Sequence, residues 1–89
     1  MGTLIFGDNM GVKDTTVQRL NQLCAEHQLT YNALANEAGV KPSTVYSLMS
    51  VEYRDMSLVT LKKLCDGLDI TLGEFFSTPE FDELEQEIK

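Results

Sequence analysis

The sequence predicts a small all-α domain, and three observations support this prediction. Apolar residues recur at the spacing of a helix face in successive segments, helix-capping residues precede those segments, and no stretch alternates as a strand would. The chain has 89 residues, of which 43% are hydrophobic, and this is enough for a single domain around one shared core. We therefore expect a compact arrangement of five helices, with a short extra helix at the C-terminus.

The first helix is predicted to follow a flexible arm. Residues 1–13 are assigned to this arm because glycines recur there without sustained periodicity, and the domain itself is assigned to residues 14–78. Thr15 and Gln18 have the spacing of a capping box, so a helix is predicted from Thr15 to a point near His27. Its core face would consist of Val17, Leu20, Leu23 and Cys24.

The next two helices are predicted on either side of a sharp turn. Thr30 is a favourable N-cap for a second, shorter helix, and Gly39 is expected to end it in the left-handed conformation. Pro42 is expected at the first position of a third helix, where its missing N–H is harmless. The inward face of that third helix would consist of Val45, Leu48 and Met49.

A fourth and a fifth helix complete the predicted domain. Ser57 is expected to cap the fourth helix and Gly67 to end it, with a core face of Leu58, Leu61, Leu64, Cys65 and Leu68. Thr71 and Glu74 again have capping-box spacing, and they open a short fifth helix. That helix would bring to the core Leu72, Phe75 and Phe76.

The acidic segment 79–89 is predicted to be helical as well. Thr78 would cap a helix that starts at Pro79, and Phe81, Leu84 and Ile88 would then share one face. A short acidic helix is marginal on its own. We therefore expect this apolar stripe to dock, either back on the domain or on a second subunit.

The segment around residues 31–50 has the residue types of a helix-turn-helix. Two helices that cross at roughly 90–120° bring their backbones close, which favours the small Ala35 at the contact point. The sharp turn favours Gly39, whose φ is unrestricted, and Val45 would fill the angle between the helices. The simpler alternative is an ordinary pair of packed helices in a bundle.

The charge balance is unusual for a protein that binds nucleic acid. The formal net charge is −7, whereas DNA affinity depends on neutralising phosphates with Lys and Arg. The distribution moderates this conflict. Residues 13–78 contain six basic and eight acidic residues, while residues 79–89 contain one basic and five acidic residues. The body of the predicted domain is therefore only mildly acidic.

Several classes of function find no support in the sequence. Cys24 and Cys65 stand far apart, with no second Cys or His at ligand spacing, so we expect buried thiols and neither a disulfide framework nor a zinc site. No phosphate-binding loop or Ser/His/Asp arrangement is present, so we expect no enzyme and no cofactor. Without an apolar run of spanning length or a signal-peptide pattern, the protein is expected in the cytoplasm.

Over residues 17–76 the sequence resembles the helix-turn-helix domains of the lambda repressor and Cro type, also called the xenobiotic response element family. The resemblance rests on Leu29 and Thr30, Leu34 and Ala35, Ala38 to Val40, Ser43 to Val45, Ser57 and Leu58 with Leu61, and Leu68 to Leu72 before Phe75 and Phe76. It implies a bacterial or phage transcriptional regulator, usually a repressor. Such a protein inserts its third helix into the major groove of double-stranded DNA and binds a palindromic operator as a homodimer.

The resemblance also implies which residues touch DNA. Its base-reading positions fall on Lys41, Ser43, Tyr46 and Ser47, and on Pro42, which has no donor to offer a base. Helical spacing independently places Ser43, Tyr46 and Ser47 opposite the predicted inward face.

Phosphate contacts are implied at the start of the second helix and in the loop after the third. Tyr31 stands where the family commonly has a phosphate-binding glutamine, and a phenol hydroxyl can donate the same bond. In the loop, Val51 and Glu52 replace the glycine and the basic residue that are frequent in the family. Phosphate contacts there would fall to Tyr53 and Arg54.

Two functions remain open at this point. The first is a sequence-specific regulator that binds duplex DNA as a homodimer. The second is a protein-interaction module on the same fold, such as an antitoxin or a partner of another repressor, which the acidic balance and the altered loop favour. Salt dependence separates the two, because phosphate neutralisation makes binding weaken steeply as salt rises.

Overall fold

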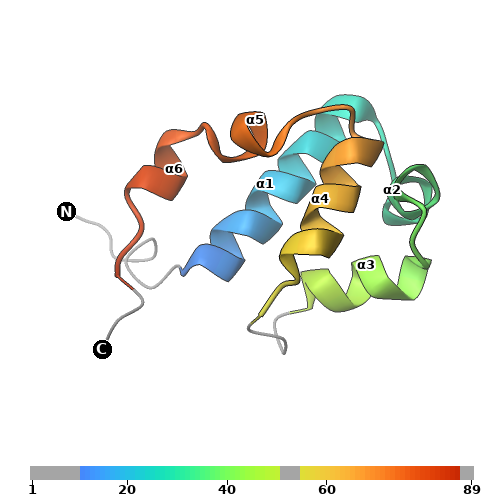
Figure 1. The fold of residues 1–89 in the computed structure, drawn as a ribbon, viewed down its shortest axis with the longest axis horizontal. Coiled ribbons are helices and arrows are strands. Elements are labelled where there is room, and N and C mark those ends of the chain that lie inside the picture. The colour runs from blue at the N-terminus through green and yellow to red at the C-terminus, as the bar shows by residue number, and fades with distance from the viewer. Residues whose placement is uncertain (1–10, 51–54, 87–89) are drawn as a thin grey trace.

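The computed structural model describes residues 11–50 and 55–86, which form helices and no strands. In these residues α2 packs against α3 and α4, α4 packs against α5, and α6 packs against α1 (Figure 1). The predicted all-α class, with five helices and a short extra one, is confirmed. The helices are α1 (Val12–His27), α2 (Tyr31–Ala38), α3 (Pro42–Met49), α4 (Leu58–Gly67), α5 (Leu72–Phe76) and α6 (Pro79–Asp82).

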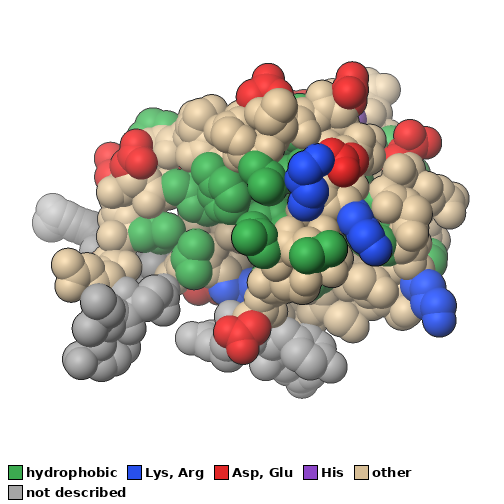
Figure 2. Space-filling model, viewed as in Figure 1, with side chains coloured by type: hydrophobic (Ala, Val, Ile, Leu, Met, Phe, Trp, Pro, Cys, Tyr) green, Lys and Arg blue, Asp and Glu red, His purple; other side chains and the backbone are tan. Residues whose placement is uncertain are grey.

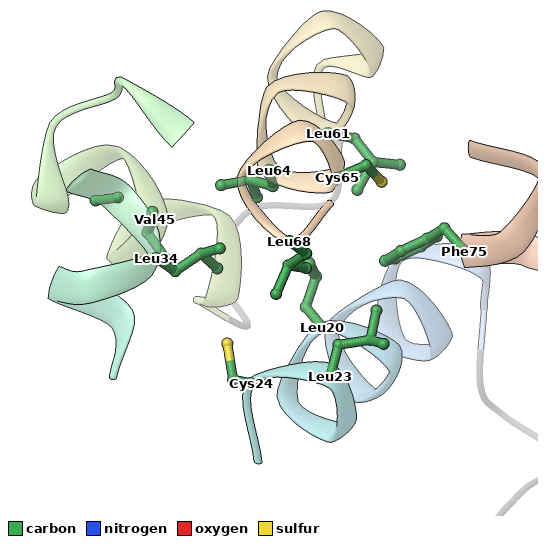
Figure 3. Packing of buried hydrophobic residues seen from close by; sticks show 11 residues of the cluster. Leu20, Leu23, Cys24, Leu34, Val45, Leu61, Leu64, Cys65, Leu68 and Phe75 are labelled. Carbon is green, nitrogen blue, oxygen red and sulfur yellow. The ribbon is translucent and has the colours of Figure 1, made fainter. Parts of the chain in front are cut away.

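One hydrophobic core contains side chains from each of the helices α1, α2, α3, α4 and α5. Figure 3 shows Leu34 and Val45, from the two helices of the predicted helix-turn-helix, on the same side of the core as Leu64 of α4. Burial of apolar surface is the main favourable term in folding, so the orientation of α3 is fixed by the same core that stabilises the domain. The buried apolar residues are Leu20, Leu23, Cys24, Leu34, Ala35, Val45, Leu61, Leu64, Cys65, Leu68 and Phe75.

The first helix starts earlier than predicted. Its N-cap is Gly11, whose N–H donates to the Asp14 carboxylate at 3.3 Å, and Thr15 is buried inside the helix. The predicted start at Thr15 is therefore wrong, and Val12 and Lys13 belong to α1 instead of the arm. An acidic side chain in the first turn satisfies free N–H groups and interacts favourably with the helix dipole, which explains the earlier start. Residues 1–10 lie outside the described residues.

The predicted turn between α2 and α3 is confirmed. The Thr30 hydroxyl accepts a hydrogen bond from the Ala33 N–H at 3.1 Å and so caps α2. Gly39 has a φ of 72°, and the next N–H, from Val40, donates to the Ala35 carbonyl at 3.0 Å. Pro42 is the first residue of α3, as predicted. These local bonds direct α3 away from the axis of α2.

Replacing Gly39 by alanine is expected to destabilise the domain by about 1–2 kcal/mol, because a Cβ disfavours the left-handed conformation. No heavy atom lies within 4 Å of the Cβ that would be added, so the cost is conformational and not steric. Thermal unfolding measures the effect. Gly39→Asn is the matched control, since asparagine tolerates positive φ, and it should lose less stability than alanine. Equal losses would contradict the left-handed turn.

One prediction about α4 is confirmed and another is wrong. Gly67 is the last residue of the helix, as predicted, but it is not left-handed; Leu68 follows with a φ of −88°, and the left-handed residue is Asp69, with a φ of 61°. Leu58 is 65% exposed, and its neighbour Val59 is 67% exposed. Helical spacing puts Leu58 on the same face as Leu61, but the buried core does not extend to the first turn of α4. The Ser57 cap is confirmed by a 3.2 Å bond from the Thr60 N–H.

The C-terminal helix is shorter than predicted. It begins at Pro79, as expected, but ends at Asp82, and residues 84–86 are not helical. Acidic side chains at the C-terminal end of a helix are unfavourable to its dipole, so Glu83 and Glu85 oppose continuation. Leu84 therefore lies beyond the helix, and Ile88 lies outside the described residues.

Phe81 docks on the domain. Its ring centroid lies 4.8 Å from that of Phe76 and 6.0 Å from that of Phe75. Both aromatic partners belong to α5, whose predicted capping box is confirmed: the Thr71 hydroxyl accepts from the Glu74 N–H at 3.0 Å, and the Glu74 carboxylate accepts from the Thr71 N–H at 2.9 Å. This cap fixes the helix on which Phe81 rests.

The two cysteines are buried thiols, as predicted. Burial raises the pKa of Cys24, and burial together with the neighbouring Asp66 raises the pKa of Cys65. Both groups are therefore less reactive than an exposed thiol would be. Among the described residues, none of the helices combines the length and the apolar character of a membrane span, and no group of His, Cys, Asp and Glu has the arrangement of a metal site.

Candidate nucleic-acid interface

The outer face of α3 and its N-cap carry the four hydrogen-bonding side chains among the five positions that the resemblance assigns to base reading. Ser43, Tyr46 and Ser47 lie in the helix and are exposed, and Lys41, its N-cap, is exposed as well. On the opposite side Val45 is completely buried. The helix is therefore held by its inner face while its outer face presents hydroxyl groups, a phenol ring and one ammonium group.

Lys13 holds the far end of α3. Its ammonium Nζ donates to the carbonyl of Ser50, the C-cap of α3, at 3.0 Å. A cation at the C-terminal end of a helix is favourable because the last carbonyls carry partial negative charge. This contact is not predictable from sequence spacing, because Lys13 lies in the predicted arm, 37 residues from its partner.

Tyr31 has a different environment from the one predicted for it. It is the first residue of α2, and its hydroxyl donates to the Asn21 side-chain oxygen at 2.6 Å. Its ring lies against Tyr46, with 5.3 Å between the centroids and an angle of 70° between the planes. A phenol has a single proton to donate, so this bond leaves none for a phosphate. The other predicted phosphate contacts, Tyr53 and Arg54, lie outside the described residues.

The negative charge of the chain is not concentrated on α3. The helix itself contains no charged residue, and Lys41 precedes it. Figure 2 shows Lys and Arg side chains from the centre of the view to its lower right, with an Asp or Glu side chain beside the central one, and further Asp and Glu side chains along the upper edge, at both sides and below. Lys62 forms an exposed ion pair with Asp66 on α4. Lys41 therefore stands at the start of a helix that carries no negative charge.

A second surface, which we call the apolar groove, lies between the first turns of α1 and α4. It has a volume of about 250 Å³, and the exposed Val12 and Leu58 form part of its wall. Figure 2 shows hydrophobic side chains gathered in the middle of this face. The complete lining is Val12, Lys13, Thr16, Asp55, Met56, Leu58, Leu61 and Phe76.

Comparison with known proteins identifies the class. Residues 19–80 match the family of Cro/C1-type helix-turn-helix DNA-binding domains. The match covers more than half of the chain and includes all of α2, α3, α4 and α5. The chain therefore belongs to this family of DNA-binding domains, and the resemblance inferred from the sequence is confirmed.

A solved structure supports the same assignment. The crystal structure of the prophage Lp1 protein 11 is similar to this chain, with 28% sequence identity and a TM-score of 0.74. The similarity covers 84% of this chain and 100% of the prophage chain. No curated protein matches the sequence. Family and fold together support a DNA-binding regulator.

Proposed function

We propose that this protein is a sequence-specific transcriptional repressor that places α3 in the major groove of duplex DNA. The observation that carries the proposal is the exposed row of Lys41, Ser43, Tyr46 and Ser47 on a helix whose other side is anchored by Val45. The major groove admits an α-helix and presents a distinct pattern of donors and acceptors for each base pair. Membership of the Cro/C1-type family supports the same orientation.

Each exposed group has a proposed role. Ser43, Tyr46 and Ser47 hydrogen-bond to base edges, and Lys41 reaches either a guanine edge or a phosphate. Tyr53 and Arg54, which follow α3 in the sequence, are the proposed phosphate contacts. A phosphate contact by Tyr31 would require its hydroxyl to leave Asn21.

We also propose a homodimer that acts in the cytoplasm of a bacterium or of a phage-infected cell. A dimer would place two α3 helices in successive major grooves, roughly 34–36 Å apart. The exposed Val12, Leu58 and Val59 supply apolar surface that a second subunit can cover. The similarity to a prophage protein supports the proposed setting.

The same apolar surface favours a second candidate function. Exposed apolar side chains beside a groove are typical of protein-binding surfaces, and the net charge of −7 disfavours tight DNA binding. The alternative is a module that binds another protein, such as a toxin or a partner repressor. Such binding does not require the steep salt dependence of phosphate neutralisation.

Selection of bound duplexes from a random pool tests the proposal and gives the half-site spacing. With the selected operator, Tyr46→Ala and Ser43→Ala should each lower the binding free energy that distinguishes the correct base from the others by about 1–3 kcal/mol at particular positions. Each substitution removes a side-chain group that contacts a base edge. Lys41→Ala should flatten the slope of log K against log salt by about one unit if the ammonium reaches a phosphate. Lys63→Ala, which removes an exposed lysine from α4, is the matched control.

Binding titrations against the operator and a scrambled duplex at several salt concentrations provide the measurement. The control variant should keep both the sequence preference and the salt slope of the unmodified protein. If the unmodified protein prefers neither duplex and its salt slope is shallow, DNA recognition is wrong, and the protein-interaction module takes its place.

A further inference from the structure

The side chain of Tyr46 is exposed, but its ring contacts another aromatic ring. It is 54% exposed on the outer face of α3, where a tyrosine without neighbours would exchange between staggered rotamers. A recognition group must be held close to its productive geometry if it is to distinguish one base from another. The orientation of Tyr46 therefore bears on discrimination.

Tyr31 supplies one restraint. The two rings meet edge to face, an arrangement that aromatic pairs prefer, with 5.3 Å between their centroids. Tyr31 is half-buried and packs against the hydrophobic core, so it is better fixed than its exposed partner. The ring of Tyr46 thus leans on a side chain of the neighbouring helix.

Asn21 supplies the restraint on Tyr31. The Tyr31 hydroxyl donates to the Asn21 side-chain oxygen at 2.6 Å, which fixes the outer end of the phenol ring. Asn21 is an exposed residue of α1, ten positions before Tyr31. A continuous series of contacts therefore runs from α1 through the first residue of α2 to the outer face of α3.

We propose that Asn21 and Tyr31 are positioning residues for sequence discrimination, which act by holding the ring of Tyr46 in one orientation on α3. The inference rests on the proposed function, because it assumes that Tyr46 reads a base. Neither residue needs to touch DNA. This role differs from a phosphate contact by Tyr31, which would support all sequences alike and would not depend on Asn21.

The variants Asn21→Ala and Tyr31→Phe break the hydrogen bond while preserving the helix and the tyrosine ring, respectively. Asn36→Ala, which replaces an exposed asparagine of α2, is the matched control. Binding is measured to the selected operator, to its single base-pair variants and to a scrambled duplex. The thermal midpoint of each variant reports whether folding is preserved.

Both variants should lower the ratio of affinities for correct and altered base pairs by about three- to tenfold, which is a fraction of one good base contact. This loss should be confined to the base pairs at which Tyr46→Ala lowers discrimination. Affinity for the scrambled duplex and all properties of Asn36→Ala should stay unchanged. In a Tyr46→Ala background, Asn21→Ala should have no further effect, since the residues act in series. An equal loss on every duplex, or an effect that persists without the Tyr46 ring, would overturn the proposal.

A measurement without DNA separates this inference from the proposed function. NMR relaxation of the Tyr46 ring carbons in the free protein should show an ordered side chain. The ring should become mobile in Asn21→Ala and in Tyr31→Phe, but not in Asn36→Ala. Unchanged ring order would overturn the positioning role even if the protein binds its operator. If ring order is lost as expected but the unmodified protein has no sequence preference, the proposed function fails, and the role in discrimination fails with it.

Discussion

Replacing Gly67 by alanine is expected to destabilise the domain by about 2–3 kcal/mol, the cost of overpacking a close helix contact. An added Cβ would lie 2.9 Å from the backbone nitrogen of Ala38 and 3.0 Å from the backbone carbon of Glu37. Both atoms belong to the backbone of α2, so no flexible side chain can move aside. The end of α4 would have to shift away from α2, which also packs against α3.

The sign of this effect is informative, because the same change in an unobstructed helix gains about 1 kcal/mol in helix propensity. Gly73→Ala in α5 is the matched control. Its added Cβ would meet only the Thr71 hydroxyl oxygen, at an ordinary distance of 3.7 Å. Urea unfolding of both variants provides the measurement, and we expect the control to be neutral or slightly more stable. Should Gly67→Ala match Gly73→Ala, the close approach of α4 to α2 would be refuted.

Gly67 shows that local signals can predict where a helix ends without predicting what the terminal glycine does. Capping depends on residues a few positions apart, so Thr30, Ser57 and Thr71 were predictable from the sequence. A glycine near a helix end serves either as a left-handed stop, as Gly39 does, or as a point of close approach. Only the position of α2 decides between these uses for Gly67, and that position depends on the whole core.

The outer face of α3 was predictable for a similar reason. Ser43, Tyr46 and Ser47 follow one another at helical spacing, so the burial of Val45 places them outward. The contacts that support this face were not predictable, because they join different helices. Lys13 reaches Ser50 across 37 positions, and Asn21 reaches Tyr31 across ten. A lone lysine or asparagine on a helix surface shows no periodicity that would reveal such a partner.

Replacing Phe75 by alanine is expected to cost about 3–5 kcal/mol, the usual range for deleting a buried aromatic ring. Phe75 is fully buried, and its ring centroid lies 5.0 Å from that of Phe76. The Arg19 guanidinium lies 5.9 Å from the centre of the Phe75 ring, and its Nε donates to the Phe75 carbonyl at 2.8 Å. Deletion of the ring would leave a cavity where α1, α4 and α5 meet and would also remove a contact of Phe81.

Phe81→Ala is the comparison that separates the contribution of the core to the free energy of unfolding from the contribution of the C-terminal segment. The Phe81 side chain is only half-buried on Phe75 and Phe76, so its loss is expected to cost about 1–2 kcal/mol, near the transfer free energy of a partly buried side chain. Urea unfolding at matched protein concentration gives both changes in the free energy of unfolding, provided that the dependence of this free energy on urea concentration is the same in all variants. Domains of this size are commonly stable by about 5–15 kcal/mol, so Phe75→Ala should remove a large share of the total. If Phe75→Ala costs no more than Phe81→Ala, α5 is not part of the core that fixes α3.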